Sequence, residues 1–553
     1  MRTTTALIAL CSVIVAGPVY SQTPYDILFR GGTVIDGSGS PGFLADVAVS
    51  GDRIVAVSRT PIAPELAGRV VDVSGKVVAP GFIDMHAHLD PLLRLPEAGS
   101  HVRQGVTTAL GGPDGGSPLP IGEHLDSAQA LGVGMNVAFL VGHNDIRESV
   151  MGMDNRAPTP AELAEMRRMV GRAMHEGAWG MSTGLKYLPG AYSETDEVVA
   201  LAAVAADSGG IYTSHLREEG LGLIASVAEA IEIGRDANIP VVLTHHKVVG
   251  APMWGASVTT LGMVDSARAA GIDVMIDQYP YTATYTGISV LVPAWARAGG
   301  DTAFFRRLED EALRDSIMDG IVFNILNDRG GGDIRRVQLA KVKWMPELEG
   351  QTLRDWALLK GLDPTPETGA ELVVEAMRRG GASAIYHVLD EGDVERIMRH
   401  PQTMIGSDGR LTQPGEGHPH PRWYGTFPRV LGHYVRETGV LTLPQAVHKM
   451  TGMPAARLGL TDRGRLIEGA YADIVVFDPA MVDDMATFEN PHQYPVGIDY
   501  VVVNGTFAVD AGEFQGTRAG RVLRHKPPLT ADSPRRRGVR GGKYQAPGDL
   551  SGR

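Results

Sequence analysis

Short runs that alternate apolar and polar residues occupy both ends of this chain. Between residues 25 and 84 the runs are DILFRGGTVIDG, ADVAVSGDRIVAVS and GRVVDVSGKVVAPGF, and residues 464–512 repeat the pattern in GRLIEGAYADIVVFDP and DYVVVNGTFAVDAGEF. A period of two, broken by Gly, Asp and Pro, is typical of strands with one buried face. We therefore predict one small β-sandwich built from both ends of the chain, residues 23–80 and 464–525.

The middle of the chain alternates β-rich runs with longer helical patterns such as 161–175 and 221–236. This order is typical of the α/β class and of a parallel sheet. Eight such strands close a (β/α)8 barrel, which we predict over residues 81–463. The strand candidates are 82–88, 106–112, 136–143, 179–187, 210–217, 239–247, 273–281 and 403–408.

Residues 282–402 are too many for one crossover between barrel strands. They contain charged helical patterns at 303–318, 371–380 and 391–399, so we predict an inserted lid subdomain. From residue 526 the chain turns rich in Pro, Gly and Arg, as in PRRRGVRGGK, which indicates a flexible tail more than a surface for an anionic partner.

The composition is that of a globular protein with a large core. The chain has 553 residues, 43% of them hydrophobic, and a mean hydropathy of -0.04. It carries 51 Lys and Arg against 64 Asp and Glu, a net charge of -13. A nucleic-acid binder would need an excess of positive charge to neutralise phosphates, so small molecules are the expected partners.

Residues 1–21 have the layout of a cleaved signal peptide. Arg2 precedes an apolar run from Ala6 to Gly17, which is too short to span a bilayer, so no stable membrane insertion is expected. We expect an exported protein, periplasmic or secreted. The single cysteine, Cys11, lies in this segment, so the mature chain has neither a disulfide nor a cysteine ligand for zinc.

His86 and His88 form the strongest chemical motif, at the end of the first barrel strand in PGFIDMHAHLD. Alternate strand residues share a face, so both imidazoles can point at one metal ion inside the barrel. His215 and His245 follow at the ends of later strands, where barrel enzymes carry their catalytic groups. Two unrelated polar residues would be a common alternative for the first pair alone, but the later histidines weaken it.

Asp408 ends the last strand in TMIGSDG and is a candidate metal ligand or general base, with a capping role as the alternative. His246 must face away from the pocket if its neighbour faces in, so we predict a histidine that is packed in the core or supports a metal ligand from behind. His418 and His420 lie on a Pro-rich loop, where a loop role is more expected than metal binding.

Two further motifs carry less weight. The GxGxxG pattern at 37–42 precedes an alternating strand, so it lacks the helix that would bind a pyrophosphate. The GxSxG pattern around Ser182 is not followed at once by a helix, which leaves a serine hydrolase as the weaker enzyme hypothesis.

Nine segments along the chain share a resemblance: FRGGTVIDGSG, PGFIDMHAH, RQGVTTALGG, TSHLREEG, THHKVVG, DQYPY, TMIGSDG, HPHPRWYGTFPRVL and GRLIEGAYADIVVFDP. Together they resemble the amidohydrolase superfamily and, within it, the N-acyl-D-amino-acid deacylases. The resemblance runs through most of residues 25–525. It implies a barrel flanked by a β-sandwich, with one or two zinc ions. Carried over by position, it makes metal-site residues of His86, His88, His215, His245 and Asp408, and makes Asp408 the proton shuttle.

The resemblance also makes Lys247, Tyr279 and Arg422 a clamp for the substrate carboxylate. The residues themselves favour this role, and with it an anionic small-molecule substrate. Lys247 shares the inward strand face with His245, and Tyr279 ends the seventh strand. Arg422 offers a planar fork that matches a carboxylate.

The chain departs from the resemblance at the bridge between the metal ions. The deacylases carry a bridging cysteine after the second strand, where this chain has Asp114 in GGPDGG. Two zinc ions held by neutral imidazoles repel each other, so an anionic ligand is needed between them. We favour a carboxylated Lys186, at the end of the fourth strand, as the bridge, with Asp114 as the alternative.

The sequence therefore predicts a zinc-dependent amidohydrolase that hydrolyses the amide bond of N-acyl-D-amino acids. A dipeptidase acting on D-residue or isoaspartyl dipeptides is the nearest alternative, with the same metal chemistry. A binding or structural protein on a decayed barrel is the rival from another class, and the complete set of histidines argues against it.

Overall fold

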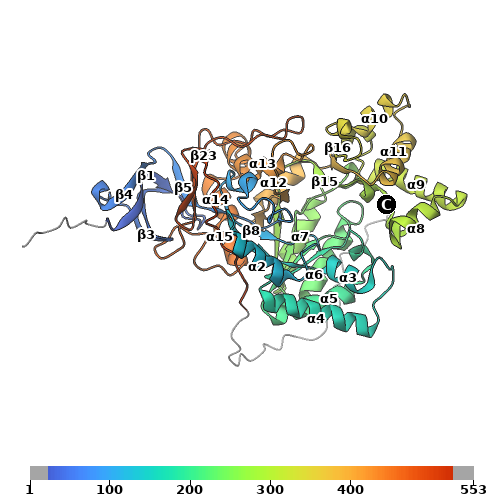
Figure 1. The fold of residues 1–553 in the computed structure, drawn as a ribbon, viewed down its shortest axis with the longest axis horizontal. Helices are drawn as coiled ribbons and strands as arrows, with labels where there is room; N and C mark the ends of the chain where they lie inside the picture. The colour runs from blue at the N-terminus through green and yellow to red at the C-terminus, as the bar shows by residue number, and fades with distance from the viewer. Residues whose placement is uncertain (1–22, 527–553) are drawn as a thin grey trace, which may run out of the picture.

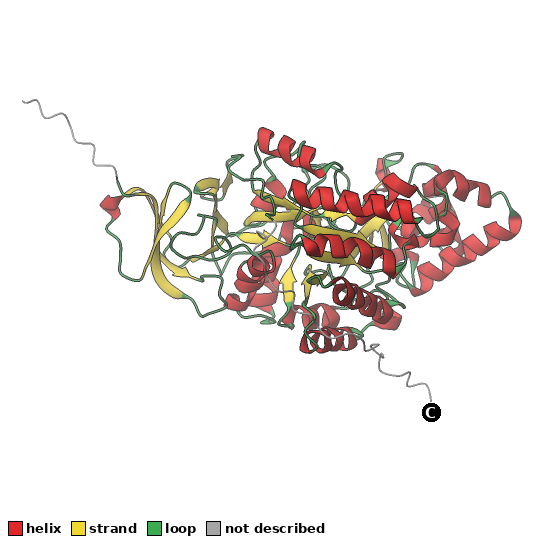
Figure 2. Cartoon of the chain, turned by 90° about the horizontal axis from the view of Figure 1, so that it is seen from below, coloured by secondary structure: helices red, strands yellow, loops and turns green. Residues whose placement is uncertain are grey.

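The computed structural model describes residues 23–526. The predicted signal peptide and nearly all of the predicted tail lie outside the described residues. The sheet of the two chain ends lies at one end of the molecule, the barrel in the middle and the inserted segment at the other end (Figure 1). Seen from below, strands dominate the first of these parts and helices the last (Figure 2).

Both chain ends contribute to one nine-stranded sheet, as predicted. Its order is β23-β22-β21-β20-β5-β1-β2-β3, and β4 pairs with β1. The antiparallel pair of β5 and β20 joins the two ends of the chain. The strands are β1(Tyr25–Val34), β2(Phe43–Ser50), β3(Arg53–Ser58), β4(Ala67–Asp72), β5(Val77–Pro80), β20(Ile474–Phe477), β21(Ile498–Val503), β22(Thr506–Asp510) and β23(Glu513–Phe514).

The period of two explains how this sheet is held. In β20, Ile474 and Val476 pack into a core shared with β1 and β2. Their neighbours Val475 and Phe477 pack into the core of the barrel instead. All four side chains are buried, so each face of the strand removes apolar surface from water. The sheet is therefore fixed against the barrel.

The barrel strands fall in all eight predicted regions. They form two parallel arcs, β6-β8-β9 and β10-β11-β12-β13-β14-β18, which meet around Leu140. The strands are β6(Phe82–Asp84), β8(Val106–Gly111), β9(Asn136–Phe139), β10(Val141–Gly142), β11(Gly180–Gly184), β12(Ile211–His215), β13(Val241–Leu243), β14(Val274–Gln278) and β18(Thr403–Ile405).

The first and last strand regions are joined directly. The short strands β7(Ala87–His88) and β19(Gly409–Arg410) pair in parallel, and the Asp408 amide donates a hydrogen bond of 2.8 Å to the His86 carbonyl oxygen. The Asp84 carboxylate accepts from the amide of Ser407 at 2.8 Å. These bonds place Asp408 beside the first histidine pair.

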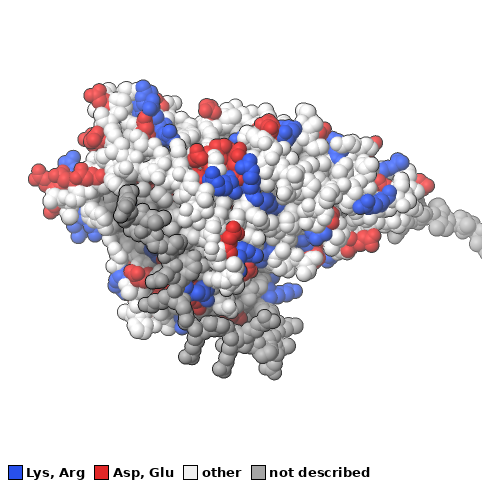
Figure 3. Space-filling model, turned by 180° about the vertical axis from the view of Figure 1, so that it is seen from behind, with Lys and Arg blue, Asp and Glu red and all other residues white. Residues whose placement is uncertain are grey.

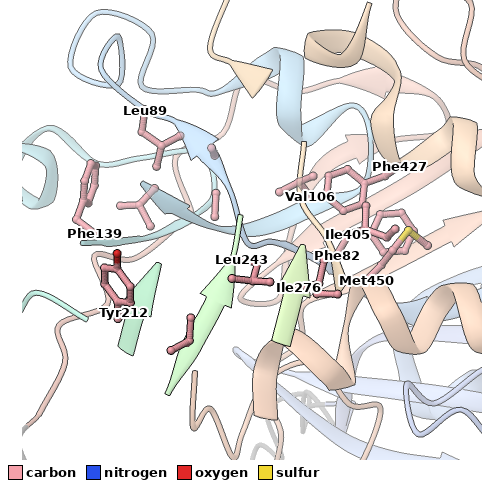
Figure 4. Packing of buried hydrophobic residues seen from close by; sticks show 14 of the residues in the cluster. Phe82, Leu89, Val106, Phe139, Tyr212, Leu243, Ile276, Ile405, Phe427 and Met450 are labelled. Carbon is pink, nitrogen blue, oxygen red and sulfur yellow. The ribbon is translucent and has the colours of Figure 1, made fainter. Parts of the chain in front are cut away.

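The barrel strands bury apolar side chains on both faces, as parallel strands covered by helices do. Leu243, Ile276 and Ile405 lie in a cluster with the helical residues Phe427 and Met450 (Figure 4). The alternate residues form a second cluster that includes Val242, Met275 and Met404.

Helices cover the barrel, and the two predicted from periodicity, α4 and α6, are confirmed. Thr159 and Glu162 form a reciprocal capping box at the start of α4, and Gly177 ends that helix in a left-handed conformation. The helices are α1(Gly99–Val102), α2(Ile121–Leu131), α3(His143–Met151), α4(Pro160–Glu176), α5(Thr195–Asp207), α6(Leu223–Ala237), α7(Ser257–Ala269), α12(Glu391–Arg399), α13(Arg422–Arg429), α14(Leu443–Met450) and α15(Gly452–Arg457).

The inserted segment has its own core and a small antiparallel sheet, β15-β17-β16. Its elements are β15(Thr284–Gly287), α8(Gly300–Arg307), α9(Glu311–Asn327), β16(Val337–Lys341), α10(Leu353–Leu359), α11(Pro366–Arg378) and β17(Ser383–Tyr386). The predicted insertion also included α12, but this helix packs against α7 and β18 in the barrel wall. The chain thus returns to the barrel before α12.

The distribution of charged side chains on the surface agrees with the mixture of basic and acidic residues in the sequence. On the face seen in Figure 3, basic and acidic side chains of the described residues are interspersed. Within residues 23–526, no helix combines the length and apolarity that crossing a membrane would need.

Candidate metal centre and active site

The four histidines predicted to bind metal converge at one end of the barrel. His86 and His88 follow β6, His215 ends β12, and His245 comes two residues after β13. Ring centroids of His86 and His245 are 4.8 Å apart, and those of His215 and His245 are 4.4 Å apart. Three of the rings are buried, and only His88 keeps 29% of its side chain exposed. Strands distant in sequence thus bring together the nitrogen ligands of a metal site.

Asp114 lies between the two halves of this histidine cluster. Its carboxylate oxygens are 3.5 Å from His86 Nε2, 3.6 Å from His88 Nε2, 3.7 Å from His215 Nδ1 and 3.3 Å from His245 Nε2. Two groups of ligand atoms, each within 4.8 Å, share this carboxylate: His86, His88 and Asp408 on one side, His215 and His245 on the other. One anion therefore faces two possible metal positions.

Asp408 connects this cluster to Arg422. Its Oδ1 lies 3.1 Å from His88 Nε2, and its Oδ2 lies 3.0 Å from an Nη of Arg422. Burial raises the pKa of Asp408, but Arg422 and the hydrogen bond to His88 outweigh burial and hold this pKa well below its usual value. The carboxylate is therefore ionised throughout the neutral range.

The donor atoms fit a zinc site. Both ring nitrogens of His86 and His215, and Oδ1 of Asp114, are buried without a hydrogen-bond partner among the described residues. Buried polar atoms are costly unless something binds them. Imidazole nitrogens and carboxylate oxygens are the ligands that zinc takes when cysteine is lacking. Burial also lowers the pKa of His215 to about 4, which keeps the ring in the neutral form that a metal requires.

Three residues of this site have a strained backbone. Asp114, His245 and Asp408 have φ angles of 55°, 36° and 48°. Side chains other than glycine rarely adopt this left-handed conformation, and it persists where surrounding contacts enforce it. The His245 amide, for example, donates a hydrogen bond of 2.6 Å to Asp277 Oδ1. Surrounding contacts thus hold these three residues in the cluster at a cost in backbone strain.

Glu219 lies on the far side of the second histidine pair. Its Oε1 is 3.3 Å from His245 Nδ1 and its Oε2 is 3.5 Å from His215 Nε2. These are the ring nitrogens that do not face Asp114. Glu219 thus places a buried negative charge behind both rings, on the side opposite Asp114.

Two buried cations balance the charge of Glu219. Lys247 Nζ and an Nη of Arg329 each lie 2.5 Å from its carboxylate. Burial raises the pKa of Glu219, but Lys247, His215 and Arg329 together hold it well below its usual value. We did not predict Glu219 or Arg329 from sequence, although Glu219 follows His215 by four residues in TSHLREEG.

The structure does not bring Lys186 to the histidines. Its ammonium pairs with Glu218 at 2.7 Å and lies 3.6 Å from Asp328. β11 ends at Gly184, and a turn follows in which the Tyr187 amide donates to the Gly184 carbonyl, so Lys186 no longer follows the alternation of the strand. Of the two bridge candidates, the structure therefore favours Asp114, which has the position shared by both ligand groups.

Of the predicted carboxylate clamp, Arg422 alone meets the open cavity. Its Nε and one Nη have no hydrogen-bond partner within the described chain, and neither does the hydroxyl of Tyr279. The guanidinium carbon lies 4.5 Å from the centroid of the Tyr279 ring. Lys247 does not fit the clamp, because Glu219 and His245 already engage its ammonium. Its charge serves the metal centre instead.

A cavity of about 290 Å³ opens onto this cluster. His88, Asp114, Asp408 and Arg422 lie on its wall, together with Tyr187. The ligand groups, the ionised carboxylate and the arginine thus border one small-molecule space.

The remaining candidates do not join the cluster. His246 is buried with Nε2 2.9 Å from a threonine hydroxyl, which is the packed role predicted for it. His418 and His420 lie 2.6 and 3.0 Å from main-chain carbonyl oxygens. Ser182 donates to the Gly112 carbonyl at 2.6 Å, so it holds the loop that carries Asp114.

Comparison with known proteins assigns the class that this site defines. The family described as "Amidohydrolase family" matches residues 69–509. The chain belongs to this amidohydrolase family and is a metal-dependent hydrolase that acts on amide bonds.

Within the family, the similarity is to deacylases. The chain is 40% identical to a D-aminoacylase of Alcaligenes xylosoxydans xylosoxydans, over 90% of this chain and 98% of that protein. It is 39% identical to an N-acyl-D-glutamate deacylase of the same organism, over 91% of this chain and 97% of that protein.

Solved structures agree. A crystal structure of D-aminoacylase superposes with a TM-score of 0.77 at 38% identity and covers 91% of this chain and 100% of that chain. An N-acyl-D-glutamate deacylase from Bordetella bronchiseptica, complexed with zinc and a phosphonate inhibitor, has the same TM-score at 37% identity and the same coverage of both chains.

Proposed function

We propose that this protein is a zinc-dependent deacylase that hydrolyses the amide bond of N-acyl-D-amino acids to a carboxylic acid and a free amino acid. The D-aminoacylase and the N-acyl-D-glutamate deacylase, which match most of the chain, support the substrate class. One observation carries the proposal. Asp408 contacts a metal-type histidine through one oxygen and Arg422 through the other.

This contact matches the shape of an N-acyl amino acid. In such a substrate the carboxylate is one carbon away from the amide nitrogen. Arg422 has two donors free to bind that carboxylate in the fork geometry typical of arginine. A substrate held there has its amide beside Asp408.

His86, His88, His215, His245, Asp114 and Asp408 are the residues that would hold zinc. Zinc in such a site supplies Lewis acidity, which lowers the pKa of water and polarises a carbonyl oxygen. Asp408, ionised at neutral pH, accepts the proton from the attacking water at its carboxylate and returns it to the leaving nitrogen. Glu219 lies behind His215 and His245, on the side opposite Asp114, where its negative charge favours the binding of a cation by these rings.

A hydrolysis screen tests the proposal. N-acetyl derivatives of D- and L-leucine, methionine, glutamate and aspartate are assayed with zinc-loaded protein, beside D-residue and isoaspartyl dipeptides. We expect turnover of at least one D-derivative and at least 100-fold lower kcat/KM for its L-enantiomer. Faster hydrolysis of the dipeptides, or equal rates for both enantiomers, would contradict the proposed function.

A further inference from the structure

A second and larger cavity, of about 830 Å³, lies between the barrel rim and the inserted segment. Barrel residues such as Leu185 and Leu221 form one wall, and Val290 and Phe323 of the insertion form the other. The smaller cavity at the metal centre accounts for the reaction itself, so this space needs a role of its own.

The two cavities adjoin each other. Tyr187, Thr286 and Gly287 line both of them. The ring of Tyr187 also lies 4.5 Å from that of His215, at the edge of the histidine cluster. Arg422 lines only the smaller cavity. The larger cavity therefore adjoins the cavity of Arg422 and the metal centre, and Tyr187 lies at their common edge.

The wall of the larger cavity is mainly suited to apolar groups. Leu221 is 50% exposed and Phe323 is 51% exposed, so both large side chains leave apolar surface in contact with water. Such exposed apolar surface beside a reactive site is typical of a ligand-binding groove.

Most of the charges on this wall are already paired. Lys186 pairs with Glu218, and Arg217 pairs with a glutamate of α6 at 2.8 Å. Arg297 adds one further guanidinium. Paired charges attract a ligand weakly, so the leucine, valine and phenylalanine side chains, together with Arg297, are the groups that this wall offers to a ligand.

We propose that the larger cavity binds the acyl group of the substrate, and that the preferred substrates are N-acyl-D-amino acids with acyl chains longer than acetyl. This inference rests on the proposed function. With the carboxylate on Arg422 and the amide beside Asp408, two arms of the substrate remain. The amino-acid side chain leaves the same carbon as the carboxylate and so stays near Arg422, whereas the acyl chain extends from the carbonyl carbon on the far side of the amide. That arm passes Tyr187 and enters the space between Leu221 and Phe323.

The test is a chain-length series on the D-amino acid that the screen finds best. Its acetyl, butyryl, hexanoyl and octanoyl derivatives are compared by kcat/KM with zinc-loaded protein. Burial of one methylene is worth about 0.8 kcal/mol, which is about fourfold per methylene at full burial. We expect a rise of about twofold to fourfold per methylene up to the octanoyl substrate.

Two variants and one control locate the effect. Leu221→Glu and Phe323→Glu place a charge on opposite walls at half-exposed positions, where folding tolerates it. Leu358→Glu is the control, because Leu358 is 48% exposed on the insertion but lies outside both cavities. We expect the two cavity variants to lose at least tenfold in kcat/KM for the octanoyl substrate and to stay within twofold of the wild type for the acetyl substrate.

The outcomes separate this inference from the proposed function. Hydrolysis of acetyl substrates with flat or falling rates along the series would overturn the acyl site and leave the proposed function standing. An equal loss with acetyl and octanoyl substrates, or the same loss in the control variant, would also overturn it. If no N-acyl-D-amino acid of any length is hydrolysed, both fail.

Discussion

Arg329 of the inserted segment reaches into the barrel and donates a hydrogen bond of 2.5 Å to the Glu219 carboxylate. The two side chains are 2% and 1% exposed. Arg329 follows α9, whereas Glu219 follows the strand that ends in His215. The insertion therefore supplies a buried counter-charge to the residue that orients the metal-site histidines.

Glu219→Gln should weaken zinc binding by about 10-fold to 100-fold, the usual cost of losing a carboxylate behind a metal-binding histidine. The amide keeps only one acceptor oxygen for two rings, and it leaves Lys247 and Arg329 without their shared anion. Competition with a chromophoric chelator measures the affinity. Glu218→Gln is the matched control, since Glu218 contacts Lys186 outside the cluster. Equal affinities in the two variants would remove Glu219 from this role.

Asp114→Ala should lose at least one of two zinc ions and most of the activity. Without its carboxylate, the two ligand groups no longer share an anion, and the repulsion between the ions is unopposed. Lys186→Ala should keep the metal content of the wild type, because its ammonium contacts Glu218. Metal analysis of both variants decides between the two bridge candidates. The opposite pattern would restore the carboxylated lysine.

Asp408→Asn should retain the fold and lower kcat by about 100-fold to 10,000-fold, because an amide cannot accept and return a proton. Single-turnover and steady-state rates with an N-acetyl-D-amino acid measure the effect. Asp236→Asn, on the exposed surface of α6, is the control. A kcat near that of the wild type would exclude Asp408 as the base.

Arg422→Lys should raise KM for substrates with a carboxylate by about tenfold, because an ammonium cannot reproduce two parallel hydrogen bonds. The corresponding amide substrates, which lack that charge, should be affected less. Arg335→Lys serves as the control, since Arg335 is 67% exposed on the insertion. An unchanged KM for the carboxylate substrates would contradict the clamp.

Lys449→Met should change the pH dependence of stability. Lys449 is buried in α14, donates to the carbonyl oxygens of His400 and Thr403, and has its pKa lowered by burial to about 8. Its folded pKa lies below its unfolded pKa of 10.5. The wild type therefore gains stability as pH rises from 8 to 10.5, by roughly 3 kcal/mol from this group, and the variant does not.

Urea unfolding of the wild type and of Lys449→Met at pH 7.5 to 10.5 measures this difference. Lys360→Met, at a partly exposed position on the insertion, is the control. Parallel pH profiles for all three proteins would show that burial does not perturb Lys449.

The strands and helices could be predicted because their pattern of apolar and polar residues is local in the sequence. The alternation in ADIVVF predicts a strand whether or not its partner is known, and β20 indeed buries both faces. The end of the insertion could not be predicted from such a local pattern. The pattern at 391–399 predicts a helix, but only the structure shows that α12 packs on the barrel.

The site was predicted where side chains follow strand geometry, as in His86, His215 and Asp408. The prediction and the structure differ where the chain leaves that geometry. Lys186 lies on a turn after β11, and its direction depends on that turn. Arg329 meets Glu219 from 110 positions along the chain, a contact that one sequence without its fold does not contain.

The pairing of β5 with β20 also governs the order of events during biosynthesis. Residues 77–80 leave the ribosome long before residues 474–477, their antiparallel neighbours. Roughly 400 residues separate the two strands, so at about 5 to 20 residues per second β5 waits some 20 to 80 seconds for its partner. Until then, the nascent chain presents an unpaired strand edge of the kind that templates aggregation. That edge stays open to pairing with another chain until the last strands are made.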